Sequence, residues 1–313
     1  MKGGSSLLVL LMAMILLAGG AVFIGPVSGP SWTIIQEIRL PRVLLAIIVG
    51  VGLAGAGAVL QGILRNPLAD PFILGTSSAA AAGVILAGVL GFQHYSALYF
   101  MSLGFALLSI FVVYRIAQFN GKTPVQTLIL AGVIVNLFFN AAVFLCFSVF
   151  FRESYTVLFY LLGTLTEGDW GLIGISGTII LFGLVFTWLF SRELNILTQG
   201  EATAFHLGVN VGRAKKLLFI ASSAMVAAAV AVAGLIGFVG LIVPHMMRMI
   251  VGPDHRVLIP ASALGGAIFL ILADSLARIL VPPLEIPVGA LTALIGSPYF
   301  VYLLRKRHHS GKF

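Results

Sequence analysis

Charged residues are scarce in this chain of 313 residues: only 9% are Asp, Glu, Lys or Arg, whereas a soluble globular domain carries about 25%. Hydrophobic residues make up 60% of the sequence, and the mean hydropathy is +1.12. This balance excludes a soluble protein. It predicts an all-α polytopic membrane protein, because helices satisfy their own backbone hydrogen bonds inside a bilayer.

Cysteine is almost absent, and so are arrangements of side chains that carry out chemistry. Cys146 is the one cysteine, which excludes an intrachain disulfide and a metal–thiolate cluster. Gly121-Lys122-Thr123 ends like a phosphate-binding loop, but Ile116 stands where that loop needs glycine. The sequence has no recognisable Ser/His/Asp set and no carboxylate pair in the middle of an apolar run, which an ion-driven carrier would usually need. We therefore expect no enzyme, no resident metal and no cofactor.

Long polar loops are also missing, so no soluble domain is expected and residues 1–313 are predicted to form a single transmembrane domain. The N-terminal run imitates a signal peptide, but the many runs after it favour an uncleaved first span. A short apolar stretch at 154–167 is interpreted as a re-entrant or interfacial helix on the outer side. Ten runs are long or apolar enough to be spans: 5–24, 41–63, 71–91, 95–117, 124–150, 171–190, 214–234, 238–251, 257–280 and 287–304.

The positive charges set the orientation. The formal net charge of +8 is spread between the apolar runs, which indicates topology signals rather than nucleic-acid binding. With the N-terminus inside and ten spans, 14 Lys and Arg residues fall inside and four fall outside. This bias predicts a multi-pass protein of the cytoplasmic (inner) membrane with both termini in the cytoplasm.

A polar island, residues 191–216, interrupts the apolar sequence. Within it, Thr198 and Glu201 have the spacing of a capping box, and Gly208 is a suitable left-handed helix stop. The predicted helix is roughly 13 Å long, far too short for a bilayer core of about 30 Å. We interpret it as a cytoplasmic docking element for a soluble partner. The chain then provides a pathway, and the partner provides the energy.

Three of the four outside cations, Arg39, Arg42 and Arg278, invite a functional explanation. They could form a cationic patch that holds an anionic ligand or the acidic surface of a partner. They could equally pair with Glu37, Asp274 or Glu285, and the residues alone leave both interpretations open.

Two further segments have unusual turn chemistry. The turn at 65–71 contains Asn66 and two prolines; it is either a simple helix–helix turn or a gate at the inner mouth of a pathway. The segment 237–245 breaks an apolar run, and broken helices at membrane depth tend to line cavities. Its His245 is better explained as a hydrogen-bonded structural residue than as a metal ligand.

Taken together, these segments resemble the permease subunits of FecCD-type ABC importers, the type II importers of iron–siderophore, haem and vitamin B12. The matching segments follow family order across nearly the whole chain: Arg39-Leu-Pro-Arg42, the glycine-rich run ending at Gln61, Asn66-Pro-Leu-Ala-Asp-Pro71, Leu130-Ala-Gly-Val133, Glu201-Ala202 with Leu207-Gly208, Gly237-Phe-Val-Gly-Leu-Ile-Val-Pro-His245, Asp254-His-Arg256, Leu272-Ala-Asp-Ser-Leu-Ala-Arg278 and Glu285-Ile-Pro-Val-Gly289.

The resemblance implies a homodimer of ten-span subunits with the pathway along its twofold axis. Two cytoplasmic ATPase subunits would bind a coupling helix at about 199–207, and a periplasmic or lipid-anchored binding protein would dock outside on Arg39, Arg42 and Arg278. The implied coupling residues are Gln199, Gly200, Glu201, Ala202, Phe205, His206, Leu207 and Gly208.

The resemblance also implies positions along the pathway. Asn66 and Leu68 match an inner gate, and Val125 and Gln126 match a second gate position, where the family example has small hydroxyl residues. The difference leaves the size and closure of this gate open. Asn136, Asn140 and Phe144 are expected to line the pathway, or alternatively to pack helices.

The substrate is the least determined part of this interpretation. An iron–siderophore is the first choice because it is the most frequent substrate in the family, and haem, cobalamin or an oxyanion are the alternatives. No side chain in the sequence is a diagnostic ligand that would decide between them. The rival function is an ion-coupled secondary transporter that acts without an ATPase. A signalling or scaffold membrane protein would show no flux.

Overall fold

The computed structural model describes residues 2–25, 31–92, 94–119, 123–150, 160–165, 169–281 and 284–309. Every regular element reported in these residues is helical, which confirms the all-α prediction. The elements are α1 (Lys2–Ala21), α2 (Trp32–Ile34), η1 (Ile35–Arg39), α3 (Leu40–Ile63), η2 (Pro71–Leu74), α4 (Thr76–Val89), α5 (Tyr95–Ala117), α6 (Val125–Phe150), α8 (Trp170–Leu189), α9 (Ser191–Thr198), α10 (Glu201–His206), α11 (Val211–Ala233), α12 (Val239–Val251), α13 (His255–Ile279) and α14 (Val288–His309).

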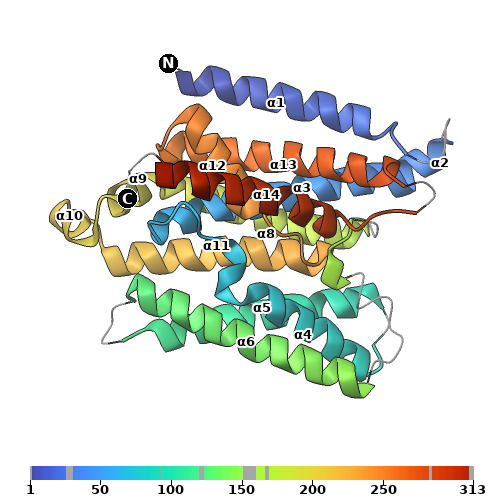
Figure 1. Ribbon diagram of the computed structural model, residues 1–313, viewed down its shortest axis with the longest axis horizontal. Coiled ribbons are helices and arrows are strands. Elements are labelled where there is room, and N and C mark those ends of the chain that lie inside the picture. The colour runs from blue at the N-terminus through green and yellow to red at the C-terminus, as the bar shows by residue number, and fades with distance from the viewer. Residues whose placement is uncertain are drawn as a thin grey trace.

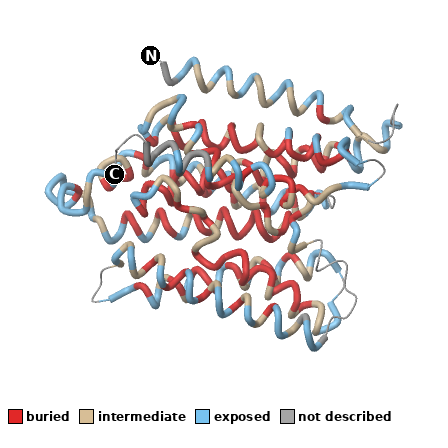
Figure 2. Tube along the Cα trace, in the orientation of Figure 1, coloured by how far each residue is buried: buried red, intermediate tan, exposed pale blue. Residues whose placement is uncertain are grey.

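Helix α3 lies at the centre of the bundle, and α13, α11, α12 and α8 pack against it (Figure 1). Helices α4, α5 and α6 form a second group on one side, which α11 joins to the centre. Helix α1 lies on the opposite side and packs mainly on α13. Buried positions are therefore concentrated in the middle of the bundle, whereas α1 is largely exposed (Figure 2).

Glycines allow α3 to approach its neighbours closely. A Cβ atom added to Gly50 would lie 2.3 Å from the carbonyl oxygen of Gly266 in α13. One added to Gly57 would lie 2.0 Å from the carbonyl oxygen of Gly240 in α12. Small residues matter at such crossings because the hydrophobic effect does not drive helices together inside lipid, so close van der Waals packing has to.

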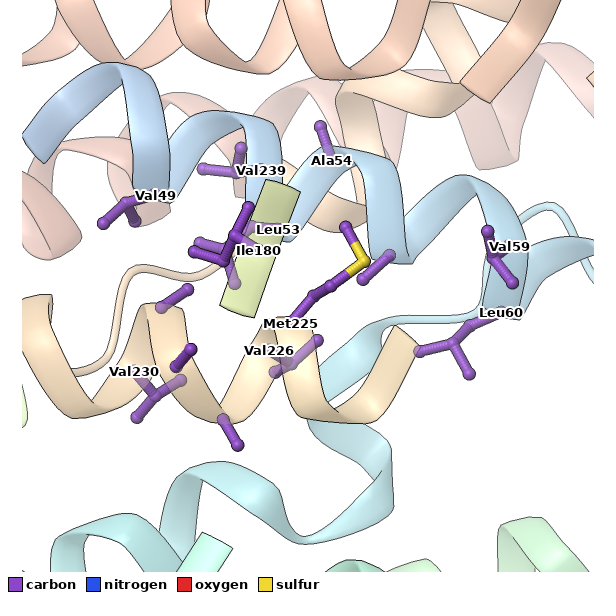
Figure 3. Close-up of a cluster of buried hydrophobic side chains, with 14 of the residues drawn as sticks. Val49, Leu53, Ala54, Val59, Leu60, Ile180, Met225, Val226, Val230 and Val239 are labelled. Atoms are coloured by element: carbon purple, nitrogen blue, oxygen red, sulfur yellow. The ribbon is translucent and has the colours of Figure 1, made fainter. Parts of the chain in front are cut away.

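Between these crossings the core is filled by apolar side chains from three helices. Leu53 of α3, Ile180 of α8 and Met225 of α11 are at most 1% exposed and lie close together (Figure 3). A methyl group added to Gly183 would fall 2.5 Å from Met225 Cγ, so α8 also has a small residue at its contact with α11. This packing holds fixed the helices whose ends carry the candidate site.

Each predicted span overlaps a helix, but one span starts differently from the prediction. The run expected at 71–91 begins as the 3-10 turn η2, which ends at Gly75 in a left-handed conformation (φ +76°) before α4. Among the described residues, seven helices are long and apolar enough to cross a membrane, and α4, α12 and part of α14 are shorter apolar helices. The count of ten spans stays a prediction.

The segment expected to be re-entrant, 154–167, is described only from Tyr160 to Leu165. These residues are inserted into the bundle: Thr164 donates its amide to Ala233 O at 2.9 Å, and the Gly289 amide donates to Gly163 O at 3.1 Å. Leu165 is completely buried. The described part therefore connects the end of α11 to the start of α14. The rest of the stretch lies outside the described residues, as do Lys122, Arg152 and Lys312 of the charge count.

Candidate functional site

Helix α10 is a short helix at one end of the bundle (Figure 1). It spans Glu201–His206 and lies between two glycines with positive φ angles, Gly200 (φ +128°) and Gly208 (φ +80°). Such backbone conformations favour glycine because it has no Cβ. The short helix and its glycine stop agree with the sequence prediction.

The predicted capping box is wrong. Helix α9 continues to Thr198, whose hydroxyl donates to Asn195 O at 2.7 Å, and Gln199 is the C-cap of α9 rather than part of α10. Gly200 precedes α10 with no side-chain cap. The Glu201 carboxylate does not reach back to Thr198, because it forms ion pairs with cations from other segments.

Two large apolar side chains are exposed on α10 and directly after it. Phe205 is 73% exposed and Leu207 61% exposed, whereas Ala204 on the opposite face is buried. Phe205 also lines a hollow of about 750 Å³ beside α10, which Glu201 and Lys215 border as well. Large apolar side chains next to a hollow at a polar end of a membrane protein are typical of a protein-binding surface.

The carboxylate of Glu201 is the centre of a charged group that we call the Glu201 cluster: Arg65, Thr123, Glu201 and Lys215. Glu201 Oε1 lies 2.6 Å from Lys215 Nζ and 3.2 Å from Arg65 Nη2. Lys215 Nζ also donates to the Thr123 carbonyl at 3.1 Å. The cluster therefore joins α10 to α11 and to the turns that follow α3 and precede α6.

These two turns are the ones in which gate positions were predicted. A pocket of about 320 Å³ between them is lined by Val125 and Gln126 together with Arg65 and Glu201. Asn66 and Leu68 share the turn of Arg65 but are not among the described residues that line this pocket. Asn66 instead shapes the turn, since its Oδ1 accepts from the Leu68 amide at 3.0 Å.

The predicted pathway residues share one face of α6. Asn140 Nδ2 donates to Asn136 Oδ1 at 3.4 Å, and Phe144, one turn further on, is 73% exposed. Helix α6 lies at the edge of the bundle (Figure 1), and along this face Asn136 and Asn140 are half-buried. Both alternatives, pathway lining and helix packing, stay predictions.

At the other end of the bundle, Arg42 and Arg278 are paired with acidic side chains in a group that we call the Asp274 cluster: Arg39, Arg42, Asp274, Arg278 and Glu285. Arg42 Nε lies 2.8 Å from Asp274 Oδ1, and Arg42 Nη1 lies 2.6 Å from Glu285 Oε2. Arg278 Nη2 lies 3.1 Å from Asp274 Oδ2. The structure thus favours the pairing interpretation that the sequence analysis left open beside docking.

The remaining donors of this cluster bind the chain segment that follows α1. Arg39 Nη1 donates to Val22 O and Phe23 O, at 3.2 and 3.0 Å, and Arg278 Nη1 donates to Ile24 O at 2.8 Å. Arg39 and Arg278 are 5% and 3% exposed. An external carboxylate would have to displace groups of this chain to reach them, so docking on these arginines stays a prediction.

Sequence analysis missed a second group of contacts beside α10. Asn195 of α9 donates to Asp254 Oδ1 at 2.6 Å, and Asn195 Oδ1 accepts from the His255 amide at 2.9 Å. Burial raises the pKa of the Asp254 carboxyl, but hydrogen bonds from the Arg256 amide and from Asn195 outweigh it, so the pKa lies below its usual value. These bonds fasten α9 to the start of α13.

The partners of Lys215 were missed as well, because Lys215 was considered only as one of the cytoplasmic cations of the polar island 191–216. A usable indication was present: Lys215 has helical spacing to Leu218, Phe219 and Ser222, all buried in α11. A lysine on the buried face of a helix requires a partner.

Among the described residues, no group of three or more His, Cys, Asp and Glu side chains is placed to hold a metal ion.

Known proteins resemble this chain over most of its length. The model of the FecCD transport family matches residues 6–306. The cobalamin import system permease protein BtuC of Halobacterium salinarum is 46% identical, with 88% of this chain and 74% of that protein covered. The hemin transport system permease protein HmuU of Yersinia pestis is 39% identical, with 95% and 94% covered. A solved structure described as an inward-facing conformation of a metal-chelate type ABC transporter is 34% identical with a TM-score of 0.86, covering 97% of this chain and 99% of that one.

Proposed function

This chain belongs to the FecCD transport family, and we propose that it is the permease subunit of an ABC importer that carries a metal chelate into the cytoplasm. The observation that carries the proposal is α10: a short helix with an exposed Phe205, too short to span a bilayer and attached by Glu201 to the turns at one end of the bundle. Such a helix suits a partner that supplies energy to a pathway without its own energy source.

The proposed assembly contains two copies of the chain in the cytoplasmic membrane. Each copy forms one domain over residues 1–313 with ten spans, and both termini are in the cytoplasm. The face of α6 that carries Asn136, Asn140 and Phe144 would line a pathway between the two copies. Two cytoplasmic ATPase subunits would bind at 199–208, and a binding protein outside the membrane would dock at the end that carries the Asp274 cluster.

The mechanism follows from where the partners bind. ATP binding closes the two ATPase subunits on each other, and their movement displaces α10 of each permease copy. The displacement moves the turn after α3, which carries Asn66 and Leu68, and the start of α6, which carries Val125 and Gln126. The pathway then alternates between outward-open and inward-open states. The chain itself hydrolyses no ATP, and the substrate shifts this equilibrium only by its differential affinity for the two states.

The proposed substrate class is a metal chelate. The two relatives named above are permeases for cobalamin and for hemin, and an iron–siderophore is the first choice from the family resemblance. Uptake into proteoliposomes that contain the full complex, measured with each of these three compounds, identifies the substrate. Uptake that requires an ion gradient and no ATPase would instead support the secondary transporter.

Replacing the exposed aromatic side chain of α10 tests the proposed surface. Phe205→Ala should reduce co-purification of the ATPase at least about tenfold, because central aromatic anchors carry much of the energy of an interface. The matched control is Phe182→Ala on α8, since both phenylalanines are 73% exposed. Equal recovery of the ATPase with both variants would show that the partner does not bind on α10.

A further inference from the structure

The two ion pairs of α10 share one carboxylate oxygen, Glu201 Oε1, and both lead toward the predicted gate. We propose, building on the proposed function, that Glu201 is the positioning residue through which α10 controls both turns of the gate. Its Oε1 holds Arg65 in the turn after α3 and Lys215 of α11, and Lys215 in turn holds the Thr123 carbonyl just before α6. A displacement of α10 therefore reaches both turns through hydrogen-bonded contacts.

The contribution of the two cations differs because their burial differs. The side chain of Lys215 is only 9% exposed; on one side it borders a cavity of about 10 Å³ with Tyr114, Val125 and Phe219, and on the other it borders the hollow beside α10. Its ammonium group depends on Glu201 and the Thr123 carbonyl, since a buried cation without partners is costly. The Arg65 side chain is 37% exposed, and exposed ion pairs contribute little. Lys215 is thus the main connection and Arg65 the weaker one.

The backbone around α10 allows it to move while its neighbour stays in place. Helix α9 is fixed to α13 by the hydrogen bonds of Asn195 with Asp254 and His255. Gly200, between α9 and α10, has φ +128° and ψ +150°, a region essentially confined to glycine, and Gly208 follows α10. Glu201 is the first residue after this hinge, so a tilt of α10 acts directly on the Glu201 cluster.

A first experiment uses the full-length chain alone in lipid nanodiscs and measures amide hydrogen exchange at the start of α6, residues 128–131, because the hydrogen-bonded amides begin with Leu128. Removing the charge with Glu201→Gln, or the connection with Lys215→Met, should speed exchange in these residues by about fivefold or more, the lower range of coupling between sites. Lys215→Arg keeps the cation and should behave like the parent chain. Glu193→Gln makes the same change as Glu201→Gln one helix earlier and should have no effect.

A second experiment separates positioning from a structural role. In proteoliposomes with the ATPase partner, Lys215→Met, which lies outside the proposed ATPase-binding segment 199–208, should leave ATP hydrolysis within about twofold and lower substrate transported per ATP about fivefold or more. A merely structural role would lower hydrolysis and uptake together. Arg65→Gln, at an exposed position, should give a smaller loss and serves if Lys215→Met does not fold.

The two experiments distinguish failure of this inference from failure of the proposed function. If no ATPase binds the parent chain, the proposed function fails, and the exchange measurement still decides whether Glu201 holds the start of α6. Unchanged exchange in Glu201→Gln, or an unchanged transport ratio in a complex that does bind the ATPase, would overturn the inference.

Discussion

An Asp274→Ala chain should unfold at a temperature several degrees below that of the parent chain. The Asp274 carboxylate is 1% exposed and lies between the guanidinium groups of Arg42 and Arg278, which are 6% and 3% exposed. Removing it leaves two buried cations side by side, and losing one partner of a buried ion pair costs roughly 3–5 kcal/mol. Thermal unfolding of the purified chain in detergent, followed by tryptophan fluorescence, measures the change.

The control for this prediction lies in the same cluster. Glu285 pairs only with Arg42 in the described residues, and its side chain is 33% exposed. Water can replace part of the hydrogen bonding that the Glu285 carboxylate gives to Arg42. Glu285→Ala should therefore lower the unfolding temperature much less than Asp274→Ala. If Glu285→Ala destabilised the chain as strongly as Asp274→Ala, the buried carboxylate would not be the centre of the cluster.

A single methyl group at Gly266 should separate the two central helices. Its Cβ would lie 2.1 Å from the Gly50 carbonyl oxygen and 2.5 Å from Ala54 Cβ, and neither contact can be relieved by rotating a side chain. Gly266→Ala therefore requires α3 and α13 to move apart, and overpacking of this kind typically costs about 1–3 kcal/mol. We expect a lower unfolding temperature and a lower yield of monodisperse protein.

Gly104 in α5 is the matched control for the helix crossing. Its added Cβ would meet nothing within 4 Å, so Gly104→Ala introduces the same methyl group into open space. Alanine is favoured over glycine inside a helix by roughly 0.5–1 kcal/mol, and the variant should be at least as stable as the parent. A Gly266→Ala chain with the stability of Gly104→Ala would mean that the close approach of α3 and α13 is not required.

The sequence predicted what depends on local composition. Apolar runs placed the helices, and glycine chemistry predicted that α10 stops before Gly208, because both signals come from residues that are neighbours in the chain. The capping box failed for a local reason too: the spacing of Thr198 and Glu201 was right, but α9 continues to Thr198, and Glu201 has stronger partners in Lys215 and Arg65.

The partners of the charged residues could not be predicted in the same way. Arg42 and Asp274 are 232 positions apart, and Arg65 and Glu201 are 136 apart. The packing of α3 against α13 brings the first pair together, and the contact of α10 with the turn after α3 brings the second pair together. The sequence therefore left the outer arginines between docking and pairing, and it gave no indication that Glu201 contacts Arg65 and Lys215 next to the predicted gate residues.

The most direct test of the proposed function is native mass spectrometry of this chain after affinity purification from its own membrane. We predict a complex of two copies of the chain with two ATPase subunits, and release of the ATPase subunits in the Phe205→Ala variant. Recovery of a lone chain that takes up substrate on an ion gradient would contradict the account.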